Sequence, residues 1–330
     1  MRLTVLLGDR ERAAAVVPGM SLGEVDRVSF EALDAALADL PYAVTTIASH
    51  AHLIDDLRAL VGHTDLVLNL CDEGYRNDLR LELHVPALLE MLELPYTGGA
   101  PRCLAYCYDK SLVRGIAQEL GVPVARGVLH APGAPIGEPS FGFPAIVKPN
   151  FGDGSFGITT RSVARDAAEF TRAILELREL YRGAILVEEY LPGQDVDVGA
   201  VGNTGAWTIF PLSTVDYSNV APGVPHIASH EFKWEEVSPY ETTTIGPATL
   251  PAEVEAGISA WSIQLLDRLE CRDYARVDWR LAADGSPRLL EVNPNTGWGA
   301  AGRLADMAAL AGLSYRDLLR TIIEAALARG

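Results

Sequence analysis

Cysteine is scarce in this chain, with four residues among 330, at positions 71, 103, 107 and 271. Cys103 and Cys107 have the i, i+4 spacing of neighbours on one helix face, but no second Cys or His pair follows at the spacing of a structural zinc site. The sequence therefore gives little support for a structural metal. Reduced thiols are the expected state, which fits a cytoplasmic protein.

Long apolar segments are also missing. No stretch approaches the roughly 18 apolar residues that a transmembrane helix needs. The apolar run from Leu3 to Gly8 is short, and Asp9 and Arg10 follow it directly. We interpret it as a buried first strand rather than a signal peptide, so no membrane segment is expected.

Basic residues are outnumbered, with 27 Lys and Arg against 44 Asp and Glu and a formal net charge of −17 at pH 7. A chain this acidic is a poor nonspecific binder of nucleic acid or anionic membrane. A small anion can still bind where a few cations converge. We therefore expect small-molecule partners and neither nucleic acid nor membrane. No His-Glu-x-x-His motif supports metalloprotease chemistry.

What the sequence does contain is a globular composition, with 48% hydrophobic and 22% charged residues, and enough length for two or three domains. The first hundred residues alternate strands and helices, which favours a parallel, doubly wound sheet. The expected elements are strands at Leu3–Gly8, Tyr42–Ala48 and Asp65–Cys71, with helices from Ser21 to Leu40, over Ala51–Val61 and over Val85–Leu94.

The remaining chain mixes helices, short strands and turns. The expected helices are Lys110–Leu120, capped by Asp109, then Asp166–Tyr181, Pro251–Leu269, Leu304–Ala311 and a last one opening at Ser314. The expected strands are Ala145–Lys148, Ala184–Tyr190, the antiparallel pair Asp195–Gly202 and Ala206–Leu212, and the hairpin Tyr274–Leu281 with Pro287–Asn293. We interpret Ser213–Ser229 as a loop with the composition of a mobile cover.

Four polar residues of the expected hairpin share one face. Residues i and i+2 of a strand point the same way, so Arg276 joins Asp278, and Glu291 joins Asn293. Their oxygen donors suit Mg²⁺, which binds one or two carboxylates together with phosphates and water. A solvated polar face on a half-exposed hairpin is the alternative interpretation.

Lys148 ends an apolar strand just before the glycine-rich turn Gly152–Gly157. Turn amides beside a lysine can grip a phosphate, although the pattern is neither a P-loop nor a dinucleotide fingerprint, and a plain turn is the alternative. Lys110 and Lys233 stand at element ends, where a solvated charge is the ordinary role. The strand end at Glu188–Leu191 could hold a purine or be an ordinary strand end.

Taken in order, these segments resemble the ATP-grasp superfamily and, within it, the D-alanine–D-alanine ligases. The segments are Tyr108-Asp-Lys110, Ile146-Val-Lys-Pro149, the Gly152–Gly157 turn, Leu186-Val-Glu-Glu-Tyr-Leu191, Phe232-Lys-Trp234, Ala275-Arg-Val-Asp278 and Leu290-Glu-Val-Asn293. The resemblance runs from about Asp65 to the C-terminus. It implies three α/β domains, which we place at residues 1–107, 108–188 and 189–330, with ATP between the last two.

The resemblance also implies a role for each matching residue. Lys110, Lys148 and Lys233 match phosphate-binding lysines, and Lys233 and Arg276 are the residues implied to act in catalysis, with Arg276 stabilising the acyl-phosphate and tetrahedral species. The glycine-rich lid over the nucleotide comprises Gly154, Ser155, Phe156 and Gly157. The adenine-binding hinge comprises Glu188, Glu189 and Leu191, and Asp195 stands where the family has a ribose-binding Glu. Asp278, Glu291 and Asn293 match the ligands of one or two Mg²⁺ ions.

The substrate-binding half departs from that family. Asn69-Leu-Cys-Asp-Glu-Gly-Tyr75 and Pro294-Asn-Thr-Gly-Trp-Gly299 replace the family's segments, and the N-terminal acidic-Ser segment is not recognisable after Gly8. We therefore predict an ADP-forming carboxylate–amine ligase with a different acceptor. The expected acceptor pocket comprises Asn295, Gly297, Trp298, Gly299, Arg303 and Trp234, although a glycine-rich loop covering a helix start is the alternative.

Three other functions compete with this prediction. One is genuine D-alanine–D-alanine ligation, which turnover of D-alanine would reveal. Another is a nucleotide-binding protein without catalysis, which would keep its function when Asp278 or Glu291 is substituted. An ATP-driven intramolecular cyclisation fits the same residues. The family also implies a homodimer.

Overall fold

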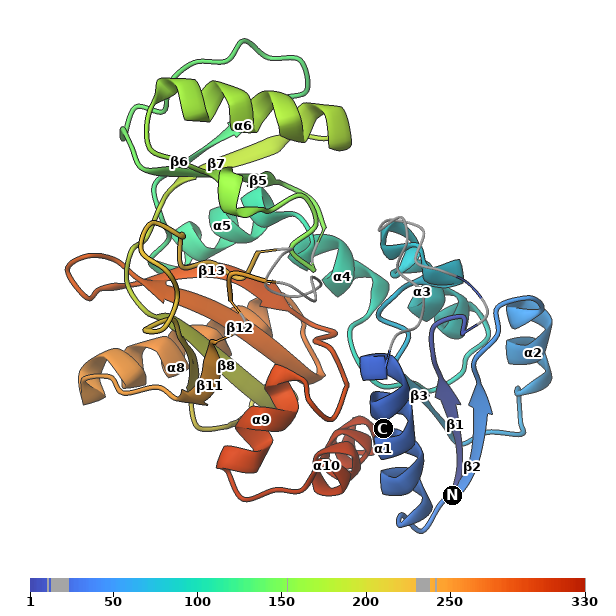
Figure 1. The fold of residues 1–330 in the computed structure, drawn as a ribbon. Helices are drawn as coiled ribbons and strands as arrows, with labels where there is room; N and C mark the ends of the chain where they lie inside the picture. The colour runs from blue at the N-terminus through green and yellow to red at the C-terminus, as the bar shows by residue number, and fades with distance from the viewer. Residues whose placement is uncertain (11, 13–23, 153, 230–237, 241, 330) are drawn as a thin grey trace.

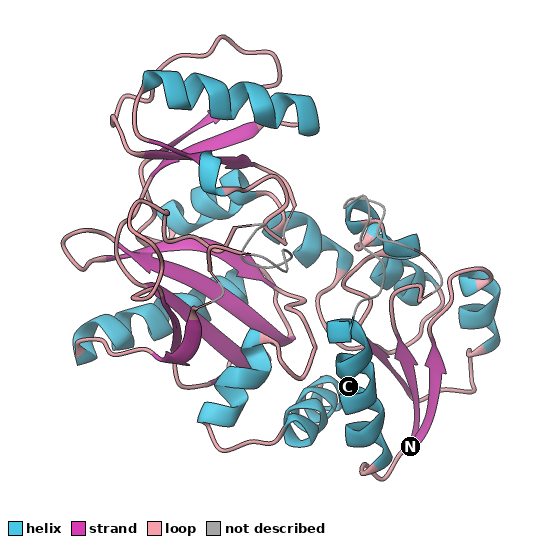
Figure 2. Ribbon diagram, in the orientation of Figure 1, coloured by secondary structure: helices cyan, strands magenta, loops and turns pink. Residues whose placement is uncertain are grey.

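The computed structural model describes residues 1–10, 12, 24–152, 154–229, 238–240 and 242–329, so Lys233 and Trp234 lie outside it. Three β-sheets with surrounding helices make up the structure (Figures 1 and 2). Among the described residues, no helix combines the length and apolarity that crossing a membrane requires.

The N-terminal sheet is parallel, as the strand–helix alternation predicts. Its strands lie in the order β2-β1-β3, with bounds Arg2–Leu6 (β1), Ala43–Ile47 (β2) and Leu66–Asn69 (β3). One face packs against α2 (Leu53–Ala59) and α3 (His84–Met91). The other packs against α1 (Glu24–Ala38) and, from the far end of the chain, α10 (Tyr315–Ala328). Periodicity predicts that α10 is amphipathic but cannot reveal which sheet it covers.

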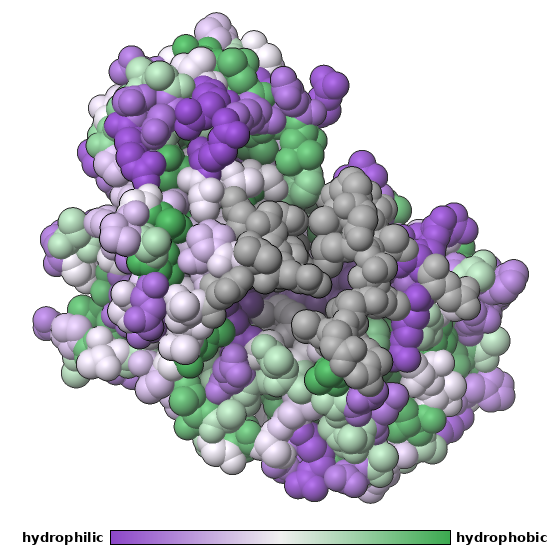
Figure 3. Space-filling model, viewed as in Figure 1, coloured by the Kyte–Doolittle hydropathy of each residue, from purple (hydrophilic) through white to green (hydrophobic). Residues whose placement is uncertain are grey.

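The second sheet is antiparallel, with the order β4-β7-β5-β6. Its strands are Gly127–His130 (β4), Ala145–Pro149 (β5), Val163–Ala164 (β6) and Ile185–Glu189 (β7). Helix α6 (Ala167–Leu180) covers one face through Phe170 and Ile174 (Figure 1). Hydrophilic residues gather over this lobe in the space-filling view, as expected for a helix with one face in solvent (Figure 3).

The third sheet has the order β11-β10-β8-β12-β13, with β9 paired to β8. Its strands are Asp195–Gly202 (β8), Thr208–Ile209 (β9), Ser213–Asp216 (β10), Thr244–Pro247 (β11), Asp273–Leu281 (β12) and Pro287–Asn293 (β13). Helices α4 (Pro101–Cys107), α5 (Lys110–Glu119) and α8 (Ala252–Arg268) contribute to its apolar core. Helix α9 (Arg303–Leu310) packs against β8. Short 3₁₀ turns lie at Tyr75–Asn77, Leu79–Leu81 and Thr160–Ser162.

One expectation about the third sheet is wrong. The segment Ser213–Ser229 was expected to be a loop throughout, but its first four residues form β10, which pairs with β8 and β11. The residues Ser-Thr-Val-Asp favour a strand only weakly, and the prolines and glycine that follow them are typical of a loop. The pairing strand β11 lies about 30 residues further along the chain, so the pairing is not evident from the local sequence.

The limits of the three proposed domains remain a prediction. Cys103 and Cys107 of α4 lie before the proposed boundary at 107/108, yet they share the apolar core of the third sheet. Strand β7 runs across the proposed boundary at 188/189.

Candidate active site

A cavity lies between the second and third sheets. Its empty volume is about 1060 Å³, which includes space open to solvent. On the side of the second sheet, the lining residues include Lys110, Lys148, Gly152, Ser155, Phe156, Glu188 and Glu189. On the side of the third sheet and α9, they include Asp195, Asp197, Arg276, Asp278, Glu291 and Arg303.

Strand register brings the predicted hairpin residues together. Asp278 of β12 lies opposite Glu291 of β13, and Arg276 lies opposite Asn293. On the other side of β12, Asp278 lies opposite Asp197 of β8. Three carboxylates therefore occupy one row across three adjacent strands. Sequence analysis missed Asp197, because nothing within β8 indicates which residue will lie beside Asp278.

Arg276 is fixed by two partners. Its Nε donates to Asp278 Oδ1 at 2.6 Å, and one terminal nitrogen donates to Asp278 Oδ2 at 2.9 Å. The other terminal nitrogen donates to Thr296 Oγ1 at 2.7 Å. Burial acts against the charged form, but the charge of Asp278 raises the pKa of Arg276, so the guanidinium stays protonated. Thr296 was not among the predicted site residues.

The row of carboxylates concentrates negative charge at a largely buried place, since Asp197 and Asp278 are buried and the Glu291 side chain is 25% exposed. Burial, with the charges of Asp197 and Glu291, raises the pKa of Asp278 against the opposing effect of Arg276. Asn293 Nδ2 donates to Asp278 Oδ2 at 3.1 Å. Crowded carboxylates with an amide oxygen nearby form the hard-oxygen donor set that Mg²⁺ binds, so these residues fit that ion.

Two of the three predicted phosphate-binding lysines, Lys110 and Lys148, lie among the described residues, and carboxylates hold both. Lys148 Nζ lies 2.5 Å from Glu188 Oε2, and Glu188 also pairs with Arg114. Lys110 Nζ lies 3.4 Å from Glu291 Oε2 and donates to the Gly152 carbonyl. All of these charged side chains are buried or largely buried, so their pairs are weakly screened by solvent and hold the lysines in place at the cavity wall.

The hinge residues differ in their environments. Glu188 is buried with Lys148, whereas Glu189 accepts from Arg126 Nε at 2.7 Å near the surface. The Leu191 carbonyl accepts from Arg280 Nε at 2.6 Å. Arg280 also bonds Asp195 at 2.6 Å, and Tyr217 donates to the other oxygen of Asp195 at 2.8 Å. Asp195 is therefore held in a fixed orientation at the cavity wall.

The glycine-rich turn contains a run of left-handed backbone. Gly154, Ser155 and Gly157 have φ values of 64°, 61° and 70°, a region that glycine enters without the Cβ clash of other residues. Ser155 is the exception, and its Oγ donates to the Ala228 carbonyl at 2.5 Å. This bond ties the turn to the segment that follows β10.

The predicted acceptor residues lie in three different environments. Arg303 lines the cavity and donates to Asp197 at 2.6 Å. Asn295 is buried, donating to Glu82 at 2.9 Å and accepting from the Gly99 backbone at 2.9 Å. Trp298 donates to Asp72 at 3.1 Å. Gly297 and Gly299 flank Trp298, close to Asp72 and Ser29 respectively.

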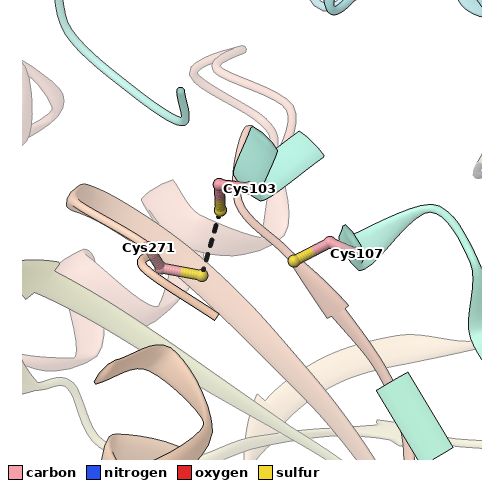
Figure 4. Close-up of side chains that lie close together, drawn as sticks. All are labelled: Cys103, Cys107 and Cys271. Atoms are coloured by element: carbon pink, nitrogen blue, oxygen red, sulfur yellow. Dashed lines mark hydrogen bonds between the residues drawn. The ribbon is translucent and has the colours of Figure 1, made fainter. Parts of the chain in front are cut away.

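Away from the cavity, three buried thiols gather between α4 and the start of β12 (Figure 4). Cys103 Sγ lies 3.6 Å from Cys271 Sγ, and Cys107 completes the group. Sequence analysis found no partner for Cys103 and Cys107, because Cys271 is 168 residues away. The thiols sit within the apolar core of the third sheet, where cysteine packs as a small apolar side chain.

Comparison with known proteins identifies the family. The family model described as the D-ala D-ala ligase C-terminus matches residues 136–324. The chain belongs to this family. A D-alanine–D-alanine ligase of Moorella thermoacetica is 26% identical, with 99% of both chains covered. Uncharacterized protein y4sG of Sinorhizobium fredii is 31% identical, covering 79% of this chain and 74% of its own.

The fold agrees with that assignment. The crystal structure of a Bacillus anthracis D-alanine–D-alanine ligase complexed with ATP has a TM-score of 0.73 and 24% identity, with 100% of this chain and 98% of that chain covered. The fold is thus ATP-grasp, as predicted. The protein is an ATP-dependent, ADP-forming carboxylate–amine ligase of the D-alanine–D-alanine ligase family, acting on small molecules with ATP and Mg²⁺.

Proposed function

We propose that this ligase activates the carboxylate of an amino acid or related small molecule in the cavity between β5–β7 and β12–β13, and joins it to an amine acceptor other than D-alanine. The observation that carries the proposal is the convergence on one cavity of two buried lysines, the Arg276 guanidinium and the carboxylates of Asp278 and Glu291. We also propose a cytoplasmic homodimer, by analogy with the family alone.

In this proposal, Lys110 and Lys148 hold the phosphates of ATP, together with Lys233 outside the described residues and the backbone of Gly154–Gly157. One cation about 4 Å from a phosphate oxygen gains about 4 kcal/mol at an effective dielectric constant of 20. Asp278, Glu291 and Asn293 would hold Mg²⁺, which supplies further charge neutralisation at the transferring phosphoryl group. The adenine and ribose would lie against Glu188, Glu189, Leu191 and Asp195.

The chemistry needs positioning and charge neutralisation more than covalent help. A carboxylate is a poor acyl donor until its oxygen takes the γ-phosphoryl group, which turns it into an acyl phosphate. The acceptor amine then adds to the acyl carbon, and phosphate leaves as the amide forms. Arg276, locked by Asp278 and Thr296, faces the negative oxygen that develops in this step.

The acceptor side supports a substrate other than D-alanine. Arg303, held by Asp197, places a guanidinium at the cavity wall in addition to those of Arg276 and Arg280. The segment Asn295–Arg303 differs in sequence from the matching segment of the family. The segment that contains Asp72, which accepts a hydrogen bond from Trp298, differs as well.

The test is release of ADP and phosphate with Mg²⁺ and ATP against D- and L-amino acids, singly and in pairs, with D-alanine included. We expect release to require a specific pair and to vanish in Asp278→Ala. Release with D-alanine alone at the highest rate would contradict the proposed acceptor. If a catalytically inactive nucleotide-binding protein were the correct description, ATP would bind without any release across the panel.

A further inference from the structure

Arg10 lies at a position where parallel sheets bind ligands, just beyond the carboxyl end of the central strand β1. Its backbone nitrogen donates to the Ala48 carbonyl beyond β2 at 3.0 Å. The preceding residue, Asp9, donates its backbone nitrogen to Asn77 Oδ1 at 2.7 Å. The backbone that carries Arg10 is therefore held in place by segments beyond both neighbouring strands.

The guanidinium of Arg10 has a buried edge that lacks a partner. Its Cζ lies 3.7 Å from the ring centroid of Phe30, which stacks one face of the group on an aromatic ring. Within the described part of the chain, its Nε and one terminal nitrogen are both buried and make no hydrogen bond. Leaving buried donors unpaired is costly. These two nitrogens form one edge of the planar group, the fork that receives both oxygens of a carboxylate.

Two aromatic contacts and a short stretch of chain lead from this edge toward Arg276. The Phe30 ring lies 5.6 Å from that of Trp298, centroid to centroid. Trp298 lies two residues beyond Thr296, the hydroxyl that fixes Arg276. Trp298 is anchored by Asp72 and by Tyr315, which donates to the Trp298 carbonyl at 2.9 Å. These contacts lead from Arg10 through Phe30 to Trp298, in the segment whose Thr296 bonds Arg276.

We infer that Arg10 is a specificity-determining residue that binds a second carboxylate of the substrate, so that the ligase acts on a dicarboxylic amino acid. This inference rests on the proposed function. The carboxylate that accepts the phosphoryl group has to lie beside Arg276 and the lysines. The group that pairs with Arg10 is therefore a different anion of the same molecule, and it supplies the acceptors that the buried edge lacks.

The experiment compares substrates that differ in charge and hardly in shape, namely aspartate with asparagine and glutamate with glutamine, in both stereochemistries, by ADP release. We expect the wild type to prefer the acid over the amide by at least about tenfold in kcat/KM, as for a charge-assisted bond. In Arg10→Met that preference disappears, while KM for ATP stays unchanged. Arg58→Gln, a charge loss on exposed α2, should keep the preference.

A second readout separates binding from a structural role. Because Arg10→Met removes unpaired buried donors, we expect its Tm to be at or above that of the wild type. Glutarate at millimolar concentration should raise the Tm of the wild type and leave that of Arg10→Met unchanged. Equal use of acid and amide by the wild type, or a lower Tm in Arg10→Met with the acid preference intact, overturns the inference. If the inference fails but ADP is released with some other pair of amino acids, the proposed function stands. If no pair of amino acids gives ADP release, the proposed function itself is contradicted.

Discussion

The proposed nucleotide cavity and the proposed acceptor wall, formed by Asn295–Trp298, are built in different ways. In the cavity, Arg276, Asp278, Glu291 and Asn293 come from one hairpin, and register alone brings them together. At the acceptor wall, partners come from opposite ends of the chain. Trp298 bonds Asp72, 226 residues away, and Asn295 bonds Glu82, 213 residues away. The proposed Mg²⁺-binding hairpin therefore rests on local strand geometry, while the proposed acceptor side rests on long-range packing that can change independently.

The largest expected effect falls on the cavity. Asp278→Asn keeps the shape of the side chain but removes a carboxylate that fixes Arg276 and would hold Mg²⁺. We expect kcat to fall about 10³-fold, equivalent to about 4 kcal/mol of lost charge stabilisation. Asp284→Asn, at the exposed turn of the same hairpin, is the control and should keep full ADP release. Equal activities of these two variants would remove Asp278 from the site.

The two adjacent hinge glutamates give a sharp test of burial. Glu188→Ala leaves Lys148 and Arg114 as buried charges without their partner, so we expect a loss of about 3–5 kcal/mol in the free energy of unfolding. Glu189→Ala breaks the pair with Arg126, whose side chain is 65% exposed, so the cost should be below about 1 kcal/mol. Denaturant unfolding of both variants measures the difference, and similar losses would contradict the burial argument.

The link between the two regions can be broken at Thr296. Thr296→Val keeps the shape but removes the hydroxyl that accepts from Arg276. A hydrogen bond to a charged group is worth about 1.5–3 kcal/mol, so kcat should fall roughly 10- to 100-fold with KM for ATP unchanged. Thr296→Ser should restore activity. A change in KM for ATP without a change in kcat would place Thr296 in nucleotide binding instead.

The smallest effect is expected at His50, near the acceptor side, and concerns how the free energy of unfolding depends on pH. Burial lowers the pKa of His50. The positive charges of Arg76 and Arg12 lower this pKa further, whereas the negative charge of Asp9 raises it. Its Nε2 lies 2.9 Å from the Leu7 carbonyl, its Nδ1 accepts from the Arg76 backbone at 2.7 Å, and Cys71 Sγ is 3.9 Å from the ring. The unfolded chain protonates this imidazole first, so its stabilising contribution is full above about pH 6.5 and is lost as pH falls below that value.

His50→Gln tests that assignment. The variant lacks the titrating ring, so its unfolding free energy should fall less steeply than that of the wild type between about pH 6.5 and pH 5. Parallel pH profiles of the two proteins would show that another group is responsible.

Prediction from the sequence succeeded for local patterns and failed for pairings between distant segments. Alternation and turn residues were sufficient for the β12–β13 hairpin, the Asp109 cap of α5 and the capping box at Ser314. Pairing between distant strands was not predictable, so Asp197 was missed beside Asp278 and β10 was taken for loop. Thr296 was missed because its role depends on the path of the chain after Asn293. The binding roles themselves remain predictions.

We propose that the nucleotide cavity is that of the family while the acceptor side is not. The most direct test incubates the enzyme with Mg²⁺, ATP and an equimolar mixture of D- and L-amino acids that includes D-alanine, and identifies the amide products by mass spectrometry. We predict a main product other than D-alanyl-D-alanine, formed with ADP and absent in Asp278→Asn. D-alanyl-D-alanine as the main product would contradict the account.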